Sequence, residues 1–382
     1  MPKVRFEGFS QHWELKCLGD LCVITTGKLD ANAMVENGDY DFYTSGIKKY
    51  KIDVPAFEGP AITVAGNGAT AGYMHLADGL FNAYQRTYVL TNFLANREFL
   101  YQVIGNELPR TINQEARKGN IPYIVMNMLT NLKIFIPKNE EQQKIGEFFK
   151  QLDDRIALQQ RHVEQLKQSK QGFLQKMFPK DGESVPEVRF DEYYNQWTNV
   201  RFGDITDFTT GTSKTKDINS KGKYFVMDMG SVSNTGQNIA HKKVKSSDGL
   251  LCSGDLIMPK DDIGGGFIIG RTAYIDQDNK YVLGDHVYKL SVNPEKVNSL
   301  YLHFYINTPQ INIQFKRLVT GSAQLGIRSI YLCDESILIP SISEQQKIGE
   351  FFKQLDDLIA KNERELELLQ ETKKGFLQKM FV

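Results

Sequence analysis

Residue patterns that bind phosphates or clamp a target base are the first features to locate in this 382-residue chain. A loop of the form G-x-x-x-x-G-K-[ST] cradles phosphates with its backbone N–H groups. Gly222-Lys223 is followed here by Tyr224, and Asp217 stands at the first glycine position. Asn307-Thr308-Pro309-Gln310 departs at two of four positions from the Asn-Pro-Pro-aromatic clamp of adenine methyltransferases. We interpret it as a helix interruption, and we expect neither an ATP site nor a methyl-donor site.

Other patterns with possible chemistry each have a simpler structural interpretation. Gly264-Gly265-Gly266 could approach a phosphate closely, or could form a hairpin or bulge. Asp278-Asn279-Lys280 has the D-x-K form of nucleases but lies in a polar turn, which the turn interpretation explains. Asp153-Asp154 and Asp356-Asp357 are adjacent acids on helices, where neighbours point about 100° apart and do not form a catalytic pair. The scattered His and Cys residues do not predict a zinc site.

Basic and amide side chains interleaved with aromatic ones fit contact with DNA, because cations bind phosphates while planar or amide groups read base edges. The first half of the chain offers Lys48, Lys49, Lys51, Gln85, Arg86, Arg110, Asn113, Arg117 and Lys118. The second half offers Lys214, Lys216, Lys260, Arg271, Gln324 and Arg328. Charged runs on loops are also common as plain solvated surface, so both interpretations stay open for each residue.

The composition limits the class of protein. Lys+Arg and Asp+Glu both number 46, so any nucleic-acid binding must come from local basic surfaces. Apolar residues make up 41% and charged residues 24%, which excludes a wholly disordered or collagen-like chain. The four cysteines are too few and scattered for a disulfide framework, so we expect reduced, buried thiols. Neither a membrane-spanning run nor a secretory signal is evident, so the cytoplasm is the expected compartment.

An internal repeat determines the expected organisation. Residues 141–154 (EQQKIGEFFKQLDD) recur unchanged as residues 344–357, an offset of 203 (344 minus 141). Residues 172–178 (GFLQKMF) return at the same offset as 375–381. A weaker repeat opens each half at an offset of 184 and includes both tryptophans of the chain, Trp13 and Trp197. The chain therefore alternates variable and constant segments.

Apolar residues in the constant segments alternate at spacings of four and three, which is the seam of a heptad helix. The seam begins with Ile145, Phe149, Leu152 and Ile156 in the first segment and with Ile348, Phe352, Leu355 and Ile359 in the second. Each segment follows a proline, and Ser343-x-x-Gln346 resembles a capping box for the second. We predict that the two helices pack on each other as an intramolecular antiparallel coiled coil, with a homodimer of parallel zippers as the alternative.

The remaining segments contain short extended runs bounded by turn residues, with helical patterns at 97–106 and 299–318. This predicts an α+β chain with two mixed, mostly β domains in a pseudo-two-fold arrangement around the two helices. The predicted segments are a first domain (1–140), a central helix (141–178), a linker (179–185), a second domain (186–340) and a C-terminal helix (341–382).

These repeated motifs resemble one family, the specificity subunits of type I restriction–modification systems. The resemblance is carried by E-Q-Q-K-I-G-E-F-F-x-x-L-D, by G-F-L-Q-K-M-F, and by the opening V-R-F…W…L-G-D…T-x-G, and it spans essentially the whole chain. It implies two target-recognition domains that read a bipartite, asymmetric DNA target. It also implies a noncatalytic chain that recruits two adenine methyltransferase subunits and two ATP-driven restriction subunits.

The resemblance places the cofactors outside this chain: S-adenosylmethionine, ATP and Mg would belong to the partner subunits. Two alternatives from other classes remain at this point. One is a self-contained DNA-modifying enzyme, which S-adenosylmethionine binding by the isolated chain would reveal. The other is a coiled-coil adaptor with two protein-binding heads, which would show no salt-dependent affinity for DNA.

Overall fold

The computed structural model describes residues 2–115, 122–263, 265–322 and 324–381. The chain divides into two compact units, and each long helix contributes to both. Unit 1 consists of Met1–Arg161 with Glu363–Val382, and unit 2 consists of His162–Asn362. Strands, short helices and part of each long helix occur in each unit, which confirms the predicted α+β class with repeated domains and paired long helices.

Unit 1 contains two four-stranded sheets and a two-stranded ribbon, β1-β10. One sheet has the order β2-β9-β6-β7 and is antiparallel; the other has the order β4-β3-β8-β5, with β3 and β8 parallel. The strands are β1 Glu14–Cys17, β2 Val23–Thr26, β3 Tyr40–Tyr43, β4 Tyr50–Ile52, β5 Phe57–Glu58, β6 Ala61–Ala65, β7 Met74–Ala77, β8 Leu80–Ala83, β9 Thr87–Thr91 and β10 Lys133–Ile136. Every residue of β6 is buried, as its short apolar run predicts.

Unit 2 repeats this plan with the sheets β12-β19-β15-β17 and β14-β13-β18 and the ribbons β11-β21 and β16-β20. Its parallel pair is β13 and β18, the counterpart of β3 and β8. The strands are β11 Thr198–Arg201, β12 Thr206–Thr210, β13 Tyr224–Met227, β14 Lys243–Val244, β15 Leu256–Pro259, β16 Asp261–Asp262, β17 Ala273–Tyr274, β18 Tyr281–Leu283, β19 Val287–Val292, β20 Leu325–Gly326 and β21 Ser336–Ile339.

Short helices cover the core of each unit at equivalent places. Unit 1 has α1 Arg97–Glu115 and α2 Met126–Thr130; unit 2 has α4 Ser299–Ile306, α5 Pro309–Lys316 and α6 Ser329–Asp334. Asn96 and Asn298 cap α1 and α4 by accepting from the N–H groups of Phe99 and Tyr301, each at 2.9 Å. The helix pattern at 299–318 is interrupted at Asn307-Thr308, because Pro309 starts α5, so this interpretation of the Asn-Thr-Pro run is confirmed.

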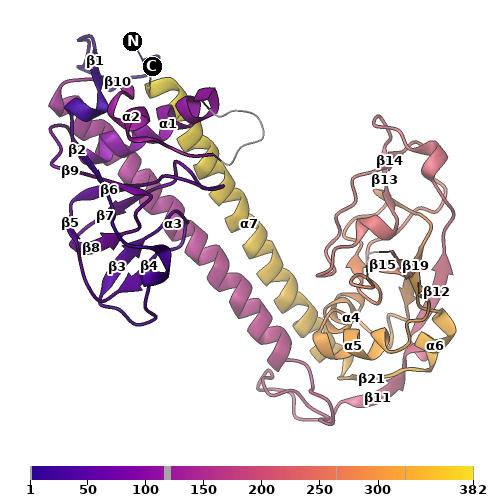
Figure 1. Cartoon of the computed structure of the whole chain (residues 1–382). Helices are drawn as coiled ribbons and strands as arrows, with labels where there is room; N and C mark the ends of the chain where they lie inside the picture. Colours follow the sequence, from indigo (N-terminus) through magenta and orange to yellow (C-terminus); the bar gives the residue numbers. More distant parts are fainter. Residues whose placement is uncertain (1, 116–121, 264, 323, 382) are drawn as a thin grey trace. The chain divides into compact units, whose positions relative to one another are not determined.

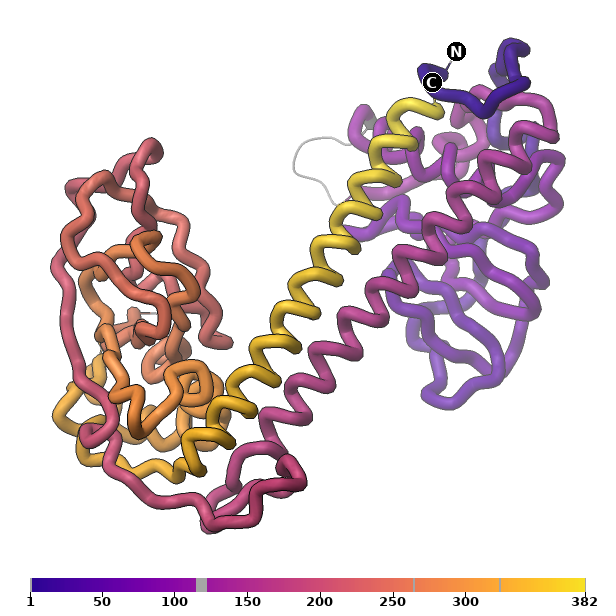
Figure 2. The backbone as a smooth tube through the Cα atoms, turned by 180° about the vertical axis from the view of Figure 1, so that it is seen from behind, coloured from indigo at the N-terminus to yellow at the C-terminus, as the bar shows by residue number. Residues whose placement is uncertain are grey.

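The two long helices, α3 Asn139–Lys176 and α7 Ile342–Met380, run in opposite directions (Figures 1 and 2). In unit 1 the start of α3 packs on the end of α7, with Phe148 and Phe376 ring centroids 4.9 Å apart. In unit 2 the same contact recurs between Phe351 and Phe173, at 5.1 Å. The antiparallel pairing predicted from the heptad seam is therefore confirmed.

All eight residues that opened the predicted seam are buried or half-buried, whereas Phe173, near the end of the first seam, is exposed. Lys170 and Lys373 continue the two seams at the same spacing of four and three, and each forms an ion pair. Lys373 lies 2.6 Å from Asp153 in unit 1, and Lys170 lies 2.5 Å from Asp356 in unit 2. The first acid of each repeated Asp-Asp pair thus faces the other helix, while the second, Asp154 or Asp357, is exposed.

A buried ion pair joins the opening motif of each half to the start of a long helix. Arg5 makes two hydrogen bonds to Glu141 at 2.9 and 2.7 Å, and Arg189 makes two to Glu344 at 2.6 and 2.7 Å. The side chains of Glu141 and Glu344 are only 2% and 1% exposed. Hydrogen bonding to Glu141 raises the pKa of Arg5, and Glu344 does the same for Arg189. Each variable segment is thus attached to the next constant one.

Two local expectations differ from the structure. The N-terminal turn of α7 is capped by Ser341, whose Oγ accepts from the Glu344 N–H at 3.4 Å, because the helix begins two residues earlier than the Ser343 capping box implies. The expectation of buried thiols is wrong for Cys252, which is exposed in a turn, whereas Cys22 is buried. All four cysteines are free thiols.

Candidate nucleic-acid interface

Four loops of unit 1 meet where strands β3, β6 and β8 end. Because β3 and β8 are parallel neighbours, the loops that follow them leave the same edge of the sheet, and the Tyr84 N–H donates to the Tyr43 carbonyl at 2.8 Å. The loop after β6 joins them, since the Gly66 N–H donates to the Arg86 carbonyl at 2.8 Å. We call residues 44–49, 66–73, 84–86 and 122–124 the unit 1 loop cluster.

Hydrogen bonds hold this cluster together. The hydroxyl of Ser45 donates to the Oδ1 atom of Asn67 at 2.6 Å, and the Ile124 N–H donates to the Gly66 carbonyl at 2.7 Å. Gly66 permits the close approach, because a Cβ atom at this position would lie 2.3 Å from the Arg86 carbonyl oxygen. The loops therefore form one surface on a structured base.

The unit 2 loop cluster has the same connections at equivalent positions. It consists of residues 228–231, 260–267 apart from 264, 284–286 and 320–328 apart from 323. The Gly284 N–H donates to the Met227 carbonyl at 2.9 Å, and the Lys260 N–H donates to the His286 carbonyl at 3.0 Å. The Ile327 N–H donates to the Lys260 carbonyl at 2.8 Å. Lys260 and His286 thus occupy the places that Gly66 and Arg86 occupy in unit 1.

Several predicted contact residues come together on these clusters. In unit 1, Lys48, Lys49, Gln85 and Arg86 are exposed on the cluster, and Lys51 is exposed on the adjoining strand β4. In unit 2, Gln324 and Arg328 are exposed and Lys260 is half-buried. The chain thus presents cations and amides together at each site, as contact with phosphates and base edges requires.

Other predicted residues lie elsewhere. Lys214 is only 6% exposed and pairs with Asp248 at 2.5 Å, and Arg271 donates to the Asn307 carbonyl at 2.5 Å, so both cations have partners within unit 2. Burial lowers the pKa of Arg271. Lys216 is exposed in the short 3-10 helix Thr215–Asp217.

Arg110 and Asn113 are exposed on α1. Arg110 lies 3.2 Å from Glu107 and lines a separate hollow of about 550 Å³ beside α2 and β10. Arg117 and Lys118 lie outside the described residues. Arg110 and Asn113 are therefore not part of the unit 1 loop cluster.

Burial favours the uncharged forms of Tyr43 and His75, which lie near the cations of the unit 1 loop cluster. Burial raises the pKa of Tyr43 to about 12, with the Asp41 carboxylate adding to the effect. Burial lowers the pKa of His75, and Lys49 lowers it further. Asp41 lies 3.0 Å from Lys51 and 3.9 Å from Lys49, so the carboxylate is closest to Lys51. Lys48 and Arg86 then provide positive charge at the surface.

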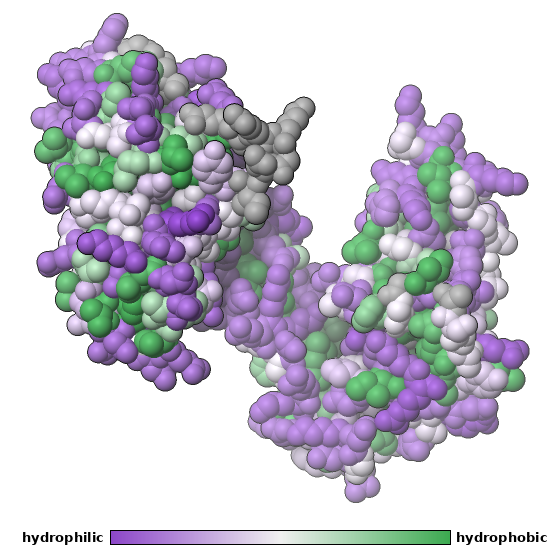
Figure 3. All heavy atoms as spheres, viewed as in Figure 1, coloured by the Kyte–Doolittle hydropathy of each residue, from purple (hydrophilic) through white to green (hydrophobic). Residues whose placement is uncertain are grey.

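Sequence reasoning missed several residues of the clusters. Exposed apolar and aromatic side chains stand among the cations: Ile47, Tyr73 and Tyr123 in unit 1, and Ile263 and Phe267 in unit 2, with Tyr331 beside the unit 2 loop cluster on α6. Lys316 lies over the Phe267 ring at 6.0 Å, and Arg328 lies over Tyr331 at 5.8 Å. The sequence signal that could have indicated these apolar and aromatic residues was the presence of glycines and basic residues close to them. Figure 3 shows hydrophilic and hydrophobic side chains interspersed on the visible face of each unit.

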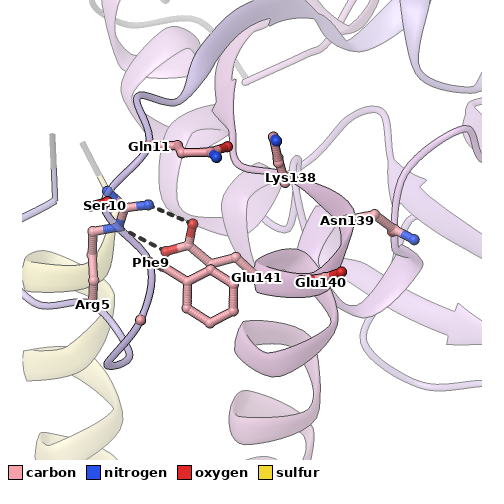
Figure 4. Close-up of a pocket in the computed structure, with 9 residues that line it drawn as sticks. Arg5, Phe9, Ser10, Gln11, Lys138, Asn139, Glu140 and Glu141 are labelled. Carbon is pink, nitrogen blue, oxygen red and sulfur yellow. Dashed lines mark hydrogen bonds and ion pairs between the residues drawn. The ribbon is translucent and has the colours of Figure 1, made fainter.

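A different hollow, of about 480 Å³, opens at the start of α3 (Figure 4). Arg5 and Glu141 lie side by side in it, and their hydrogen bonds are the dashed lines of the figure. Phe9 also lines it and carries the Lys144 ammonium over its ring at 5.1 Å. Because the buried charges of this hollow satisfy each other, we assign it a structural role.

Metal and membrane features were also sought. Among the residues that the structure describes, no three His, Cys, Asp or Glu side chains come together as a metal site would need. Of the helices in the described part of the chain, none combines the length and the apolar character that crossing a bilayer requires.

The fold belongs to a recognisable class, that of chains with two repeated α+β units connected by paired long helices. A solved structure of this class, the S subunit of a type I restriction–modification system from M. genitalium, aligns with 100% of this chain and 99% of its own at a TM-score of 0.74 and 18% identity. At that identity the likeness concerns the fold.

The family follows from the sequence match. Residues 10–168 and 194–371 match the type I restriction modification DNA specificity domain, so the chain belongs to this family, as its repeated motifs indicated. It is 35% identical over 223 residues to the EcoDI specificity subunit of Escherichia coli, a match covering 52% of this chain and 50% of the relative. It is 24% identical over 300 residues to the MjaVIII specificity subunit of Methanocaldococcus jannaschii, covering 73% and 68%. The chain thus spans about half the length of the E. coli relative.

Proposed function

We propose that this chain is the noncatalytic, DNA-reading subunit of a type I restriction–modification enzyme, and that each loop cluster reads one half of a bipartite, asymmetric target. One observation carries the proposal: the two clusters occupy equivalent places in the two units but present different side chains. A shared scaffold with different readers suits two different half-sites.

Within each cluster we assign two kinds of contact. Lys48, Lys49 and Lys260 would neutralise phosphates and so contribute affinity that falls with salt. Gln85, Arg86 and Arg328 have the planar or amide groups that pair with base edges, so they would contribute discrimination. The exposed aromatic residues of the clusters would add apolar contact.

The long helices would serve as spacer and docking surface. In the repeated fourteen-residue block, the positions of Glu141, Gln142, Ile145 and Phe149 are buried in both copies, which explains their identity by packing. The positions of Lys144, Glu147, Lys150, Gln151 and Asp154 are exposed in both copies, so burial does not explain why they are identical, although Lys150–Asp154 and Lys353–Asp357 form the same surface ion pair at 2.6 Å. A partner that binds twice would explain it.

We assign that partner as the adenine methyltransferase subunit in two copies, with two restriction subunits in the complete enzyme. S-adenosylmethionine, ATP and Mg would be bound by those partners. This chain alone would then neither methylate nor cleave DNA. Methylation should appear when a partner methyltransferase is added, whereas robust turnover by the chain free of copurified subunits would contradict the proposal.

The decisive experiment is methylome sequencing of cells with and without this gene. Loss of one bipartite methyladenine motif is expected. Replacing residues 186–340 with the equivalent domain of another specificity subunit should change one half of the motif and leave the other intact. If the motif persists without the gene, or both halves change on replacement, the proposed function is wrong.

The assigned contacts can be tested by binding. Lys49→Ala should weaken binding to all sequences and reduce the salt dependence, because it removes one phosphate contact. Gln85→Ala should instead relax one base position by about 1 to 3 kcal/mol. Lys16→Ala is the matched control, since Lys16 lies on β1 beside Glu14, away from the cluster. Identical effects of the Lys49 and Gln85 variants would refute the assignments.

A further inference from the structure

His286 in the unit 2 loop cluster has an unusual backbone conformation. Its φ angle is +61°, in the left-handed region, and the other described non-glycine residues with positive φ are both asparagines, Asn92 and Asn279. Asparagine, aspartate and histidine adopt this conformation more often than other non-glycine residues, but it is uncommon for all of them and costs free energy. Backbone strain of this kind persists where the surroundings hold it, often at functional sites.

A carboxylate orients the ring of His286. The Nδ1 atom lies 2.8 Å from the Oδ2 atom of Asp261, whose side chain is 24% exposed, whereas that of His286 is 48% exposed. Asp261 is positioned in turn by β16, which pairs with β20 at Gly326. A Cβ atom at Gly326 would lie 3.0 Å from the Asp261 Oδ1 atom, so the glycine leaves room for this carboxylate.

The arrangement defines which ring nitrogen can meet a ligand. Because Asp261 can only accept when ionised, Nδ1 carries the hydrogen of this bond, and Nε2 is left on the other side of the ring. Asp285 Oδ2 lies 3.9 Å from Nε2, so a second acceptor stands beside it. Nε2 is an acceptor in the neutral ring, and the ionised Asp285 carboxylate beside it is an acceptor in any case, so acceptors face outward at this point of the loop cluster.

The equivalent position in unit 1 has the opposite chemistry. The Arg86 and His286 carbonyls accept the same hydrogen bond, from Gly66 and Lys260 respectively, so the two side chains start from the same place on the scaffold. Arginine only donates and pairs with guanine O6 and N7, whereas an acceptor pairs with the amino group of adenine or cytosine.

We propose that His286, oriented by Asp261, is a specificity-determining residue of unit 2 that accepts a hydrogen bond from the exocyclic amino group of an adenine or cytosine. This rests on the proposed function and deepens it by naming a reader and the class of base edge it takes. The same scaffold position would then read a donor edge in one half-site and, through Arg86, an acceptor edge in the other.

The test is selection of bound duplexes by the full chain from a library randomised over both half-sites, followed by sequencing. His286→Ala should reduce discrimination at one base position of the unit 2 half-site by about 5- to 150-fold, the equivalent of one good base contact. His286→Arg should move the preference there to guanine. Asp261→Asn should weaken the same preference, because the amide can donate to Nδ1 and so allow the tautomer that carries its hydrogen on Nε2.

Two further variants separate reading from folding. Asn279→Ala is the matched control, because it also places alanine at a positive φ angle in unit 2, and it should leave every base preference unchanged. His286→Asn keeps a residue that tolerates this conformation and should favour adenine. Wild-type preferences in all His286 variants, or equal changes in both half-sites, would overturn the inference alone. If the wild-type chain selects no sequence, the proposed function itself fails.

Discussion

The buried pair Arg189–Glu344 provides the sharpest test of how the opening motifs are attached to the helices. Glu344 is 1% exposed and accepts two hydrogen bonds from Arg189, at 2.6 and 2.7 Å. Arg189→Met would leave this carboxylate buried without its cation, which typically costs about 3 to 5 kcal/mol. The double variant Arg189→Met/Glu344→Gln removes both charges and should recover part of that loss, because no uncompensated charge remains.

The assay is urea unfolding followed by tryptophan fluorescence in a Trp13→Phe background. Trp197 is then the remaining tryptophan and lies in the core of unit 2, at 4% exposure. Glu192→Gln is the control, because it breaks an exposed ion pair. The side chains of Glu192 and Lys347 are 51% and 49% exposed, so losing this pair should lower the free energy of unfolding by at most about 1 kcal/mol. If Arg189→Met costs no more than this control, or the double variant is as unstable as the sum of the singles, the reasoning is refuted.

Three further predictions concern the helices, a buried histidine and the thiols. Inserting seven residues near Gln159 keeps the heptad repeat and lengthens the helix by about 10 Å. The unread gap of the methylated motif should then widen by about three base pairs while both half-sites stay the same. An unchanged gap would exclude the spacer role. Burial lowers the pKa of His303 to about 3. In the unfolded chain the pKa of this histidine is near 6.5, so the unfolded chain binds more protons than the folded one between about pH 3 and 6.5. The free energy of unfolding should therefore fall as the pH drops through that window, by at most about 1.4 kcal/mol per pH unit. His303→Gln should remove this effect in acid titrations of unfolding. Exposed Cys252 should react rapidly with a thiol reagent at pH 8, whereas Cys22, whose pKa burial raises to about 12, should react only on unfolding; equal rates would contradict the structure.

The parts that sequence predicted correctly depend on local patterns. The seam through Ile145 and Phe149 has a period that only a helix presents on one face, and its unchanged return at Ile348 and Phe352 shows that the chain has two such helices. Two seams in one chain bury each other most simply by pairing, as the structure shows. The division of the chain at residues 140, 178, 185 and 340 stays a prediction.

The assignment of contact residues could not be made from local patterns. Lys214 and Lys49 look alike in the sequence, yet Lys214 is buried against Asp248 while Lys49 is exposed on the unit 1 loop cluster. His286 gave no signal at all, because neither its backbone conformation nor Asp261, twenty-five residues earlier, forms a motif. These roles arise from contacts between segments far apart in the chain.

The sequence by itself determined the two helices, the repeated plan, the family and the absence of the phosphate-binding and methyltransferase-clamp motifs sought in it, since each depends on residue types at fixed short spacings or on a repeat. Only the tertiary structure decided which loops meet, which cations are held in internal ion pairs, and how the buried Arg5–Glu141 and Arg189–Glu344 pairs connect variable segments to constant ones. The physical reason is that a loop residue's role depends on the neighbours that strand pairing and burial bring to it, and those neighbours are distant in sequence.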